Sequence, residues 1–188
     1  MSAPGLSDSE RFPGERVILR RVVLGDCTPA YVGWLLDPEV NAYLETRWVT
    51  QSLETVRAFV EEVRRRDDTW LLAICHGRGA QHIGNIKIGP VDGHHRCGDV
   101  SYFIGERSLW GKGLATDAIR TAVGIAFERL GLHRVQAGVY AANVGSARAL
   151  TRVGFRLEGQ LRGRFRSGEA WDDHLIYGML AGEWPSSR

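Results

Sequence analysis

The sequence predicts a single α/β domain in which strands and helices follow one another along the chain. Segments with the alternating pattern of strands and segments with the three-to-four-residue pattern of helices succeed each other from residue 16 onward. The hydrophobic period changes from strand-like to helical at Leu114, and no repeat, linker or low-complexity segment interrupts the pattern. Because 188 residues are enough for one core, we expect one domain over residues 15–185. Residues 1–14 are polar and contain proline and glycine, so we expect a flexible tail there.

The first half of the chain is predicted to contain two helices, over residues 26–37 and 52–66, and three strands, over residues 16–22, 69–75 and 82–89. The first helix has Thr28 or Asp26 as its cap and Pro29 in its first turn. In the second helix, valines and Phe59 recur at three and four residues and predict the buried face. Residues 38–49 have no clear period.

The second half is predicted to contain strands over residues 99–105, 133–140, 155–162 and 171–180, and helices beginning at Leu114 and Asn143. An alanine-rich stripe defines the longer helix, and Gly131 ends it. Asn143 is a natural cap for the shorter helix, and Gly154 follows its end.

Composition and charge exclude several function classes. With 44% hydrophobic and 24% charged residues, the chain resembles an ordinary soluble protein. A formal net charge of +2 argues against a nucleic-acid partner. Cys27, Cys75 and Cys97 are far apart and lack CxxC spacing, which favours a reducing compartment. No signal peptide or membrane span is evident, so we expect a cytoplasmic protein without a membrane partner. His94 and His95 lack a second ligand pair, and no metal is expected.

The strongest candidate for a binding site is the loop WGKGLA, residues 110–115, between a predicted strand and a predicted helix. The first amides of a helix lack intrahelical partners, and the helix dipole places partial positive charge there. Gly111 and Gly113 allow the backbone to approach a ligand closely, and Lys112 either adds charge or is solvated. The loop is suited to a pyrophosphate.

Two common phosphate-binding motifs do not fit this loop. A Walker A loop requires GxxxxGK followed by Ser or Thr, but Gly105 and Gly111 are one residue too far apart and Gly113 stands at the hydroxyl position. A Rossmann fingerprint requires a third glycine, where the sequence has Thr116, and an acidic residue at the end of the next strand, which has none.

The loop resembles the acetyl-CoA loop of the GNAT N-acetyltransferases, usually written Q/R-x-x-G-x-G/A. Gly113 and Ala115 match this pattern, and Trp110 replaces its first residue. The form WGKGxAT resembles the RimJ/RimL-like branch of the superfamily. Residues 143–159 are similar to the N-x-x-S…GF-x-x-EG segment of that branch, and residues 171–180 to its final strand. The resemblance covers nearly the whole chain.

The resemblance implies the GNAT fold, a mixed and mostly antiparallel sheet flanked by about four helices and splayed between its fourth and fifth strands. By position, these strands are residues 99–105 and 134–140. Acetyl-CoA is the implied co-substrate, and the main chain of Phe103 and Gly105 is expected to pair with its thioester and pantetheine amides. The residues implied to bind it are Phe103, Ile104, Gly105, Trp110, Gly111, Lys112, Gly113, Leu114, Ala115, Thr116 and Asn143.

The implied reaction is direct attack of a neutral amine on the thioester. It requires one group that removes a proton from the ammonium form of the substrate and one that protonates the leaving thiolate. Asp99 is the candidate acceptor, with Glu158 and Asp172 as competitors, and its alternative role is that of a surface aspartate. Ser146 is the candidate donor, and its alternative role is to cap the helix. The tyrosine that many members use as donor is replaced here by Thr151.

The resemblance therefore implies an acyltransferase, an acetyl-CoA-dependent N-acetyltransferase without a metal. Its acceptor is a primary amine, either a protein N-terminus or a small amine such as an amino sugar. The chain is expected to be a monomer or homodimer. The alternative is an acyl-CoA-binding sensor or interaction module without turnover.

Two further groups of side chains have both a structural and a functional interpretation. The first group consists of three arginines that alternate along a predicted strand and therefore share one of its faces, Arg162, Arg164 and Arg166. They either bind an acidic substrate or the adenosine 3′-phosphate, or simply face solvent. The second group consists of aromatic residues that either shape the amine pocket or belong to the core, Tyr31, Trp34, Tyr43 and Trp48.

Overall fold

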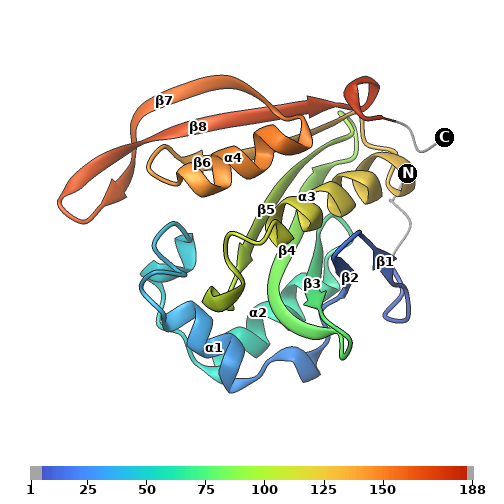
Figure 1. Cartoon of the computed structure of the whole chain (residues 1–188), viewed down its shortest axis with the longest axis vertical. Helices are drawn as coiled ribbons and strands as arrows, with labels where there is room; N and C mark the ends of the chain where they lie inside the picture. Colours follow the sequence, from blue (N-terminus) through green and yellow to red (C-terminus); the bar gives the residue numbers. More distant parts are fainter. Residues whose placement is uncertain (1–5, 186–188) are drawn as a thin grey trace.

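The structure, a computed structural model, describes residues 6–185, which contain one eight-stranded sheet. The strands follow the order β1-β2-β3-β4-β5-β6-β8-β7, and neighbouring strands are antiparallel except β5 and β6 (Figure 1). Their bounds are β1 (Phe12–Pro13), β2 (Val17–Arg21), β3 (Trp70–His76), β4 (Gln81–Asp92), β5 (Cys97–Ile104), β6 (Arg134–Tyr140), β7 (Arg156–Ser167) and β8 (Ala170–Leu180).

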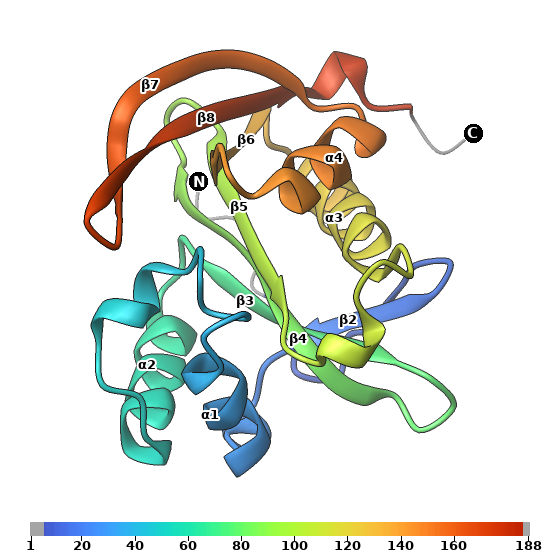
Figure 2. The ribbon, with the colours of Figure 1, turned by 60° about the vertical axis from the view of Figure 1, so that its left-hand side comes forward.

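Within residues 6–185, α-helices cover both faces of the sheet, α1 and α2 on one face and α3 and α4 on the other (Figure 2). Their bounds are α1 (Pro29–Leu36), α2 (Leu53–Arg65), α3 (Leu114–Gly124) and α4 (Val144–Val153). The 3-10 turn η2 (Glu45–Trp48) lies between α1 and α2, and a π turn extends α3. Thr28 caps α1 and Ser52 caps α2 by accepting hydrogen bonds from main-chain amides.

Two apolar clusters join the helices to the sheet. The larger lies under α3 and α4 and includes the fully buried Leu72 and Ile119, and the smaller lies under α1 and α2 and includes Tyr31 and Val60. Phe59, which was predicted for the buried face of α2, is instead 41% exposed. The valines of α2 fill the narrow face of the helix that contacts the sheet, and the Phe59 ring lies at the edge of that face.

The sheet splits between β5 and β6. The two strands pair only where Cys97 to Asp99 on β5 lie opposite Arg134 to Gln136 on β6. Beyond these residues β5 pairs with β4 alone and β6 with β8 alone. This confirms the expected GNAT fold. The splayed strands are the fifth and sixth in the chain because β1 adds an edge strand that the sequence pattern did not reveal.

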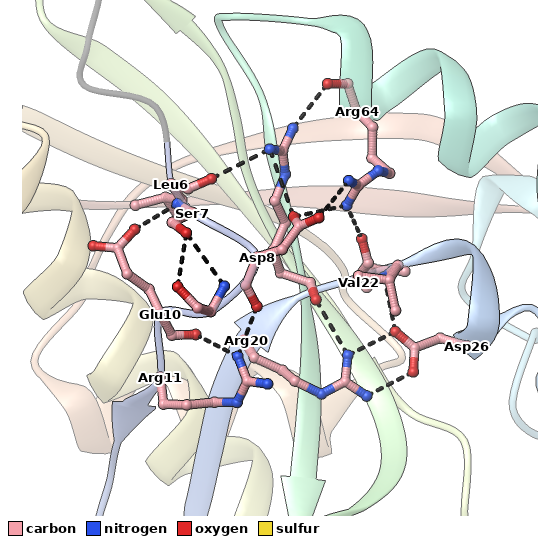
Figure 3. Close-up of polar contacts among 12 residues, drawn as sticks. Leu6, Ser7, Asp8, Glu10, Arg11, Arg20, Val22, Asp26 and Arg64 are labelled. Carbon is pink, nitrogen blue, oxygen red and sulfur yellow. Dashed lines mark hydrogen bonds and ion pairs between the residues drawn. The ribbon is translucent and has the colours of Figure 1, made fainter.

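Residues 6–14 pack against the domain instead of forming the expected tail. Leu6 is 3% exposed and belongs to the larger core, and β1 pairs with β2. The Asp8 carboxylate lies 2.8 Å from the Arg64 guanidinium, and Arg21 donates to the Leu6 carbonyl at 3.2 Å (Figure 3). Polar residues that suggested a solvated tail are therefore partners of arginines on α2 and β2. Residues 1–5 of the expected tail lie outside the described residues.

An ion pair holds the turn between β2 and α1. Arg20 donates to both carboxylate oxygens of Asp26, at 2.6 and 2.7 Å, and the Val23 amide donates to the same carboxylate at 2.8 Å (Figure 3). Burial alone would raise the pKa of Asp26, but the bonds from Arg20 and the Val23 amide outweigh burial and lower it. Asp26 therefore ties β2 to this turn, and Thr28 is left to cap α1.

Candidate active site

The loop before α3 has the geometry of an anion-binding helix terminus. Gly111 and Gly113 adopt left-handed φ angles of 74° and 78°, and no side chain caps the helix at Gly113. The first helical hydrogen bond runs from the Asp117 amide to the Gly113 carbonyl at 3.0 Å. Among residues 6–185, no group accepts a hydrogen bond from the amides of Lys112 to Thr116, so these amides are available to a ligand.

Trp110 and Asp117 hold this loop in place. The Trp110 indole donates to the Ile104 carbonyl at 2.8 Å and thereby fastens the loop to the end of β5. Asp117, 4% exposed, accepts hydrogen bonds from the amides of Glu15, Arg16 and Val17 at 3.2, 2.7 and 3.0 Å. Sequence reasoning missed Asp117, although a carboxylate within an apolar helical stripe is a signal for a buried partner.

The main-chain groups of Phe103 and Gly105 on β5 point toward β4, whereas they were expected to point into the gap between β5 and β6. The Gly105 amide donates to the Ile83 carbonyl of β4 at 2.8 Å, so it points away from the gap between β5 and β6. Because main-chain groups alternate along a strand, Phe103 also faces β4, where it pairs with Asn85. The gap is instead lined by the main chain of Tyr102 and of Ile104, whose carbonyl accepts from Trp110. The expectation for Phe103 and Gly105 was off by one residue.

Ser146 and Asn143 meet at the start of α4, and a tyrosine from β5 joins them. The Asn143 side chain accepts from the Ser146 amide at 3.1 Å, as expected for a cap. The Tyr102 hydroxyl lies 2.7 Å from the Ser146 hydroxyl and donates to the Ser146 carbonyl at 3.2 Å. Burial raises the pKa of Tyr102 to about 12, although the bond with Ser146 lowers it in part. Sequence reasoning missed Tyr102, because no pattern relates it to a serine on a distant helix.

Asp99 lies on the other face of β5, at the closed end of the gap. Gln136 donates to Asp99 Oδ1 at 2.7 Å across the last pair of the parallel ladder. Strand alternation places Asp99 on the face of α1 and α2, whereas Tyr102 faces α3 and α4. Asp99 and Ser146 are therefore on opposite faces of the sheet. The competing carboxylates have other partners, Arg134 for Glu158 at 2.5 Å and the Ala142 amide for Asp172 at 3.0 Å.

Aromatic side chains cover β5 on the Asp99 face. The ring centroids of Tyr31 and Trp34 lie 6.2 and 6.5 Å from that of Phe103. The Trp34 ring occupies the space that a Cβ at Gly105 would need. Tyr31, Trp34 and Phe103 all belong to the smaller core cluster. For Tyr31 and Trp34 the structure therefore favours the core interpretation.

A hollow of about 470 Å³ is lined by residues of η2, β6 and the β7–β8 hairpin. The tip of this hairpin lies near the segment between α1 and α2 that contains η2 (Figure 2). The lining of the hollow is Glu45, Trp48, Tyr140, Arg164, Phe165, Arg166 and Trp171. The Tyr140 and Phe165 rings stack at 3.9 Å. Tyr140 donates to Glu45 at 2.5 Å and accepts from Arg47 at 2.9 Å. Trp48 is thus a lining residue of this hollow and, at 58% exposed, not a core residue.

The expected common face of the three hairpin arginines is interrupted. The register of β7 against β8 shifts between Leu161 and Phe165, and Gly163 has a φ of 57°. Arg164 and Arg166 line the hollow, whereas Arg162 does not. The bulge is the physical reason, because it breaks the period of two on which the expectation rested.

Comparison with known proteins identifies the family. The model of the acetyltransferase (GNAT) domain matches residues 16–156. The chain belongs to the GNAT acetyltransferase family. YjcK of Bacillus subtilis, named as an N-acetyltransferase, is 31% identical over 121 residues, which are 64% of this chain and 66% of that protein. The [ribosomal protein uS5]-alanine N-acetyltransferase of Escherichia coli is 28% identical over 111 residues, 58% of this chain and 54% of that protein.

The GNAT architecture is shared with solved structures. RimJ of Mycobacterium smegmatis, in complex with CoA-disulfide, has a TM-score of 0.82 and 25% sequence identity, over 95% of this chain and 90% of that one. The resemblance to RimJ/RimL-like GNAT proteins is thereby confirmed, and the chain is an acyltransferase of this family.

Within residues 6–185, no three His, Cys, Asp or Glu side chains are placed together to hold a metal ion. Of the helices in the same residues, none is long and apolar enough to cross a membrane.

Proposed function

We propose that this GNAT protein is an acetyl-CoA-dependent N-acetyltransferase that acts on a primary amine. The observation that carries the proposal is the uncapped start of α3, where successive amides lack acceptors among the described residues. It lies beside the end of β5, to which Trp110 fastens it. A site for a pyrophosphate and the open gap between β5 and β6 are therefore adjacent, as a CoA thioester requires.

The residues proposed to hold acetyl-CoA fit that ligand. Amides from Gly111 to Thr116 bind the pyrophosphate, with Lys112 supplying positive charge. The main chain of Tyr102 and Ile104 contacts the pantetheine arm in the gap, and Asn143 contacts it from α4. Acetyl-CoA supplies an activated acetyl group, so the protein has to position the amine and move two protons.

Asp99 and Ser146 are proposed for the two proton transfers. Asp99 Oδ2 receives no hydrogen bond from residues 6–185 and accepts a proton from the ammonium form of the substrate before the amine attacks, directly or through water. The carbon–sulfur bond breaks as the carbon–nitrogen bond forms, and the nitrogen releases its second proton to water. Ser146 donates its hydroxyl proton to the sulfur and takes a proton back from water. Tyr102 is a positioning residue, because its hydroxyl lies 2.7 Å from Ser146 Oγ and 3.2 Å from the Ser146 carbonyl and so holds the serine side chain in one orientation.

The protein N-terminus is the acceptor supported by the relative that acts on an alanine of ribosomal protein uS5. The proposal is tested by measuring thiol release from acetyl-CoA with a panel of peptides, polyamines and amino sugars, and CoA binding by calorimetry. Turnover with at least one amine is expected. Binding of CoA without turnover would identify a non-catalytic acyl-CoA-binding module, and no binding of CoA or acetyl-CoA would overturn the proposal.

A further inference from the structure

The hollow beside the β7–β8 hairpin carries a surplus of positive charge. Arg164 and Arg166 line it, and neither makes an ion pair with any residue from 6 to 185. Arg47 adds a third guanidinium, which lies 4.6 Å from the Trp48 ring and 4.9 Å from the Tyr140 ring. Glu45 is the carboxylate among these lining residues, and it accepts a hydrogen bond from the Tyr140 hydroxyl.

Hydrogen bonds join the basic hairpin tip to η2. Arg47 donates to the Arg166 carbonyl at 2.7 Å and to the Tyr140 hydroxyl at 2.9 Å, and it also bonds the Ala42 carbonyl. The Phe165 ring of the hairpin stacks on the Tyr140 ring of β6, which adds a second contact that holds the hairpin. The guanidiniums of Arg164 and Arg166 are thereby carried on an anchored hairpin, which favours recognition of a charged ligand over nonspecific attraction.

The hollow lies on the same face of β6 as Gln136, the partner of Asp99. Tyr140 is the last residue of β6, one of the two splayed strands, and it also lines the hollow. It lies on the same face as Gln136, the partner of Asp99, because both belong to one alternating set of β6. A substrate whose amine enters the gap on this face can therefore extend along β6 toward the hollow.

We infer that the acceptor is the N-terminus of a polypeptide whose next few residues are acidic, with carboxylates that pair with Arg164 and Arg166. This inference rests on the proposed function. Trp48 and Trp171, 58% and 64% exposed, extend the contact surface beyond what a small amine covers. A polyamine is disfavoured, because its positive charges would face the arginines.

The test compares peptides that share one N-terminal residue and differ in charge at positions two to four. Thiol release is measured with acidic, neutral and basic peptides and with spermine, at low and high salt. The acidic peptide is expected to exceed the neutral one about tenfold in kcat/KM at low salt, through KM, and to lose part of this advantage at high salt. The basic peptide and spermine are expected to be poorest.

Charge reversal at the hairpin provides the matched variant. Arg164→Glu/Arg166→Glu should reverse the preference for acidic peptides and leave the KM for acetyl-CoA unchanged. Arg57→Glu/Arg78→Glu makes the same change of charge at two exposed residues outside the hollow and should keep the wild-type order.

Three results would count against the inference. Turnover that ignores peptide charge, or that favours basic peptides, would overturn the inference and leave the proposed function standing. Absence of turnover with every amine would overturn both. Light scattering identifies a different occupant: if the hairpin variant turns a dimer into monomers, this hollow is an interface between two copies of the chain, and the inference is wrong.

Discussion

The hydroxyl groups of Tyr102 and Ser146 lie 2.7 Å apart and join β5 to the first turn of α4. Tyr102 belongs to one splayed strand, and Ser146 to the helix that follows the other. The bond therefore bridges the two sides of the gap on the face of α3 and α4. With a pKa of about 12, caused by burial, Tyr102 remains protonated at neutral pH and can donate.

Removing either hydroxyl is expected to slow turnover without weakening the binding of acetyl-CoA. Ser146→Ala should lower kcat about a hundredfold and Tyr102→Phe about tenfold, because a proton donor is lost in the first case and misdirected in the second. If Tyr102 acts through Ser146, the double variant should be no slower than Ser146→Ala, which steady-state kinetics can measure. Additive losses would show that Tyr102 acts independently, and an unchanged kcat in Tyr102→Phe would exclude a positioning role.

Asp99→Asn is expected to lower kcat/KM about a hundredfold at pH 7. The loss should shrink as the pH rises above about 8, where an α-amine is already neutral and needs no proton acceptor. The pH profiles of wild type and variant therefore test the role, with CoA affinity as the control for folding. Parallel profiles, or equal activity at pH 7, would assign the proton transfer to another group.

Gly113→Ala is expected to weaken CoA binding about tenfold, as the left-handed φ costs about 1 kcal/mol and moves the amides that face the pyrophosphate. Gly79→Ala is the matched control, because a Cβ at either position meets no atom within 4 Å and only Gly113 has a positive φ. Calorimetry with CoA measures the difference. Similar affinities for the two variants would mean that the α3 terminus is not the pyrophosphate site.

Asp26→Asn is expected to lower the free energy of unfolding by about 3 kcal/mol at pH 7, since it leaves Arg20 without its carboxylate. The pKa of Asp26 is lower in the folded than in the unfolded chain. Its stabilisation is therefore complete above the unfolded value of about 3.9 and is lost as the pH falls through the folded pKa. Urea denaturation should show the difference between wild type and variant shrinking below about pH 4. A difference independent of pH would contradict this assignment.

The elements that follow a clear hydrophobic period could be predicted from the sequence. The valines of α2 and the alanine stripe of α3 identify amphipathic helices without reference to their neighbours, since burial of one face imposes the period. Caps at Ser52 and Asn143 depend on residues within the same turn, so they are visible locally. The short edge strand β1 and the packed residues 6–14 have no such period, because single contacts such as Asp8 with Arg64 hold them.

The candidate site divides in the same way. The loop at Gly111 and Gly113 was evident, because its backbone conformation demands glycine. The direction in which the main-chain groups of β5 point was not evident. Alternation shows that Phe103 and Gly105 point the same way, but it does not tell whether they point toward β4 or toward β6. The β7 bulge likewise separates Arg162 from Arg164 without a clear sign in the sequence.

By itself, the sequence determined the order of the helices and of the strands other than β1, the GNAT loop and the family, because these depend on residues close together in the chain. Only the tertiary structure decided that the Tyr102 hydroxyl lies beside the Ser146 hydroxyl and that Asp117 accepts hydrogen bonds from main-chain amides at the start of β2. It also decided that the Arg166 carbonyl of the hairpin bonds with Arg47 of η2. Each of these contacts joins residues far apart in the chain, and it exists because the packing of the sheet against its helices brings them together.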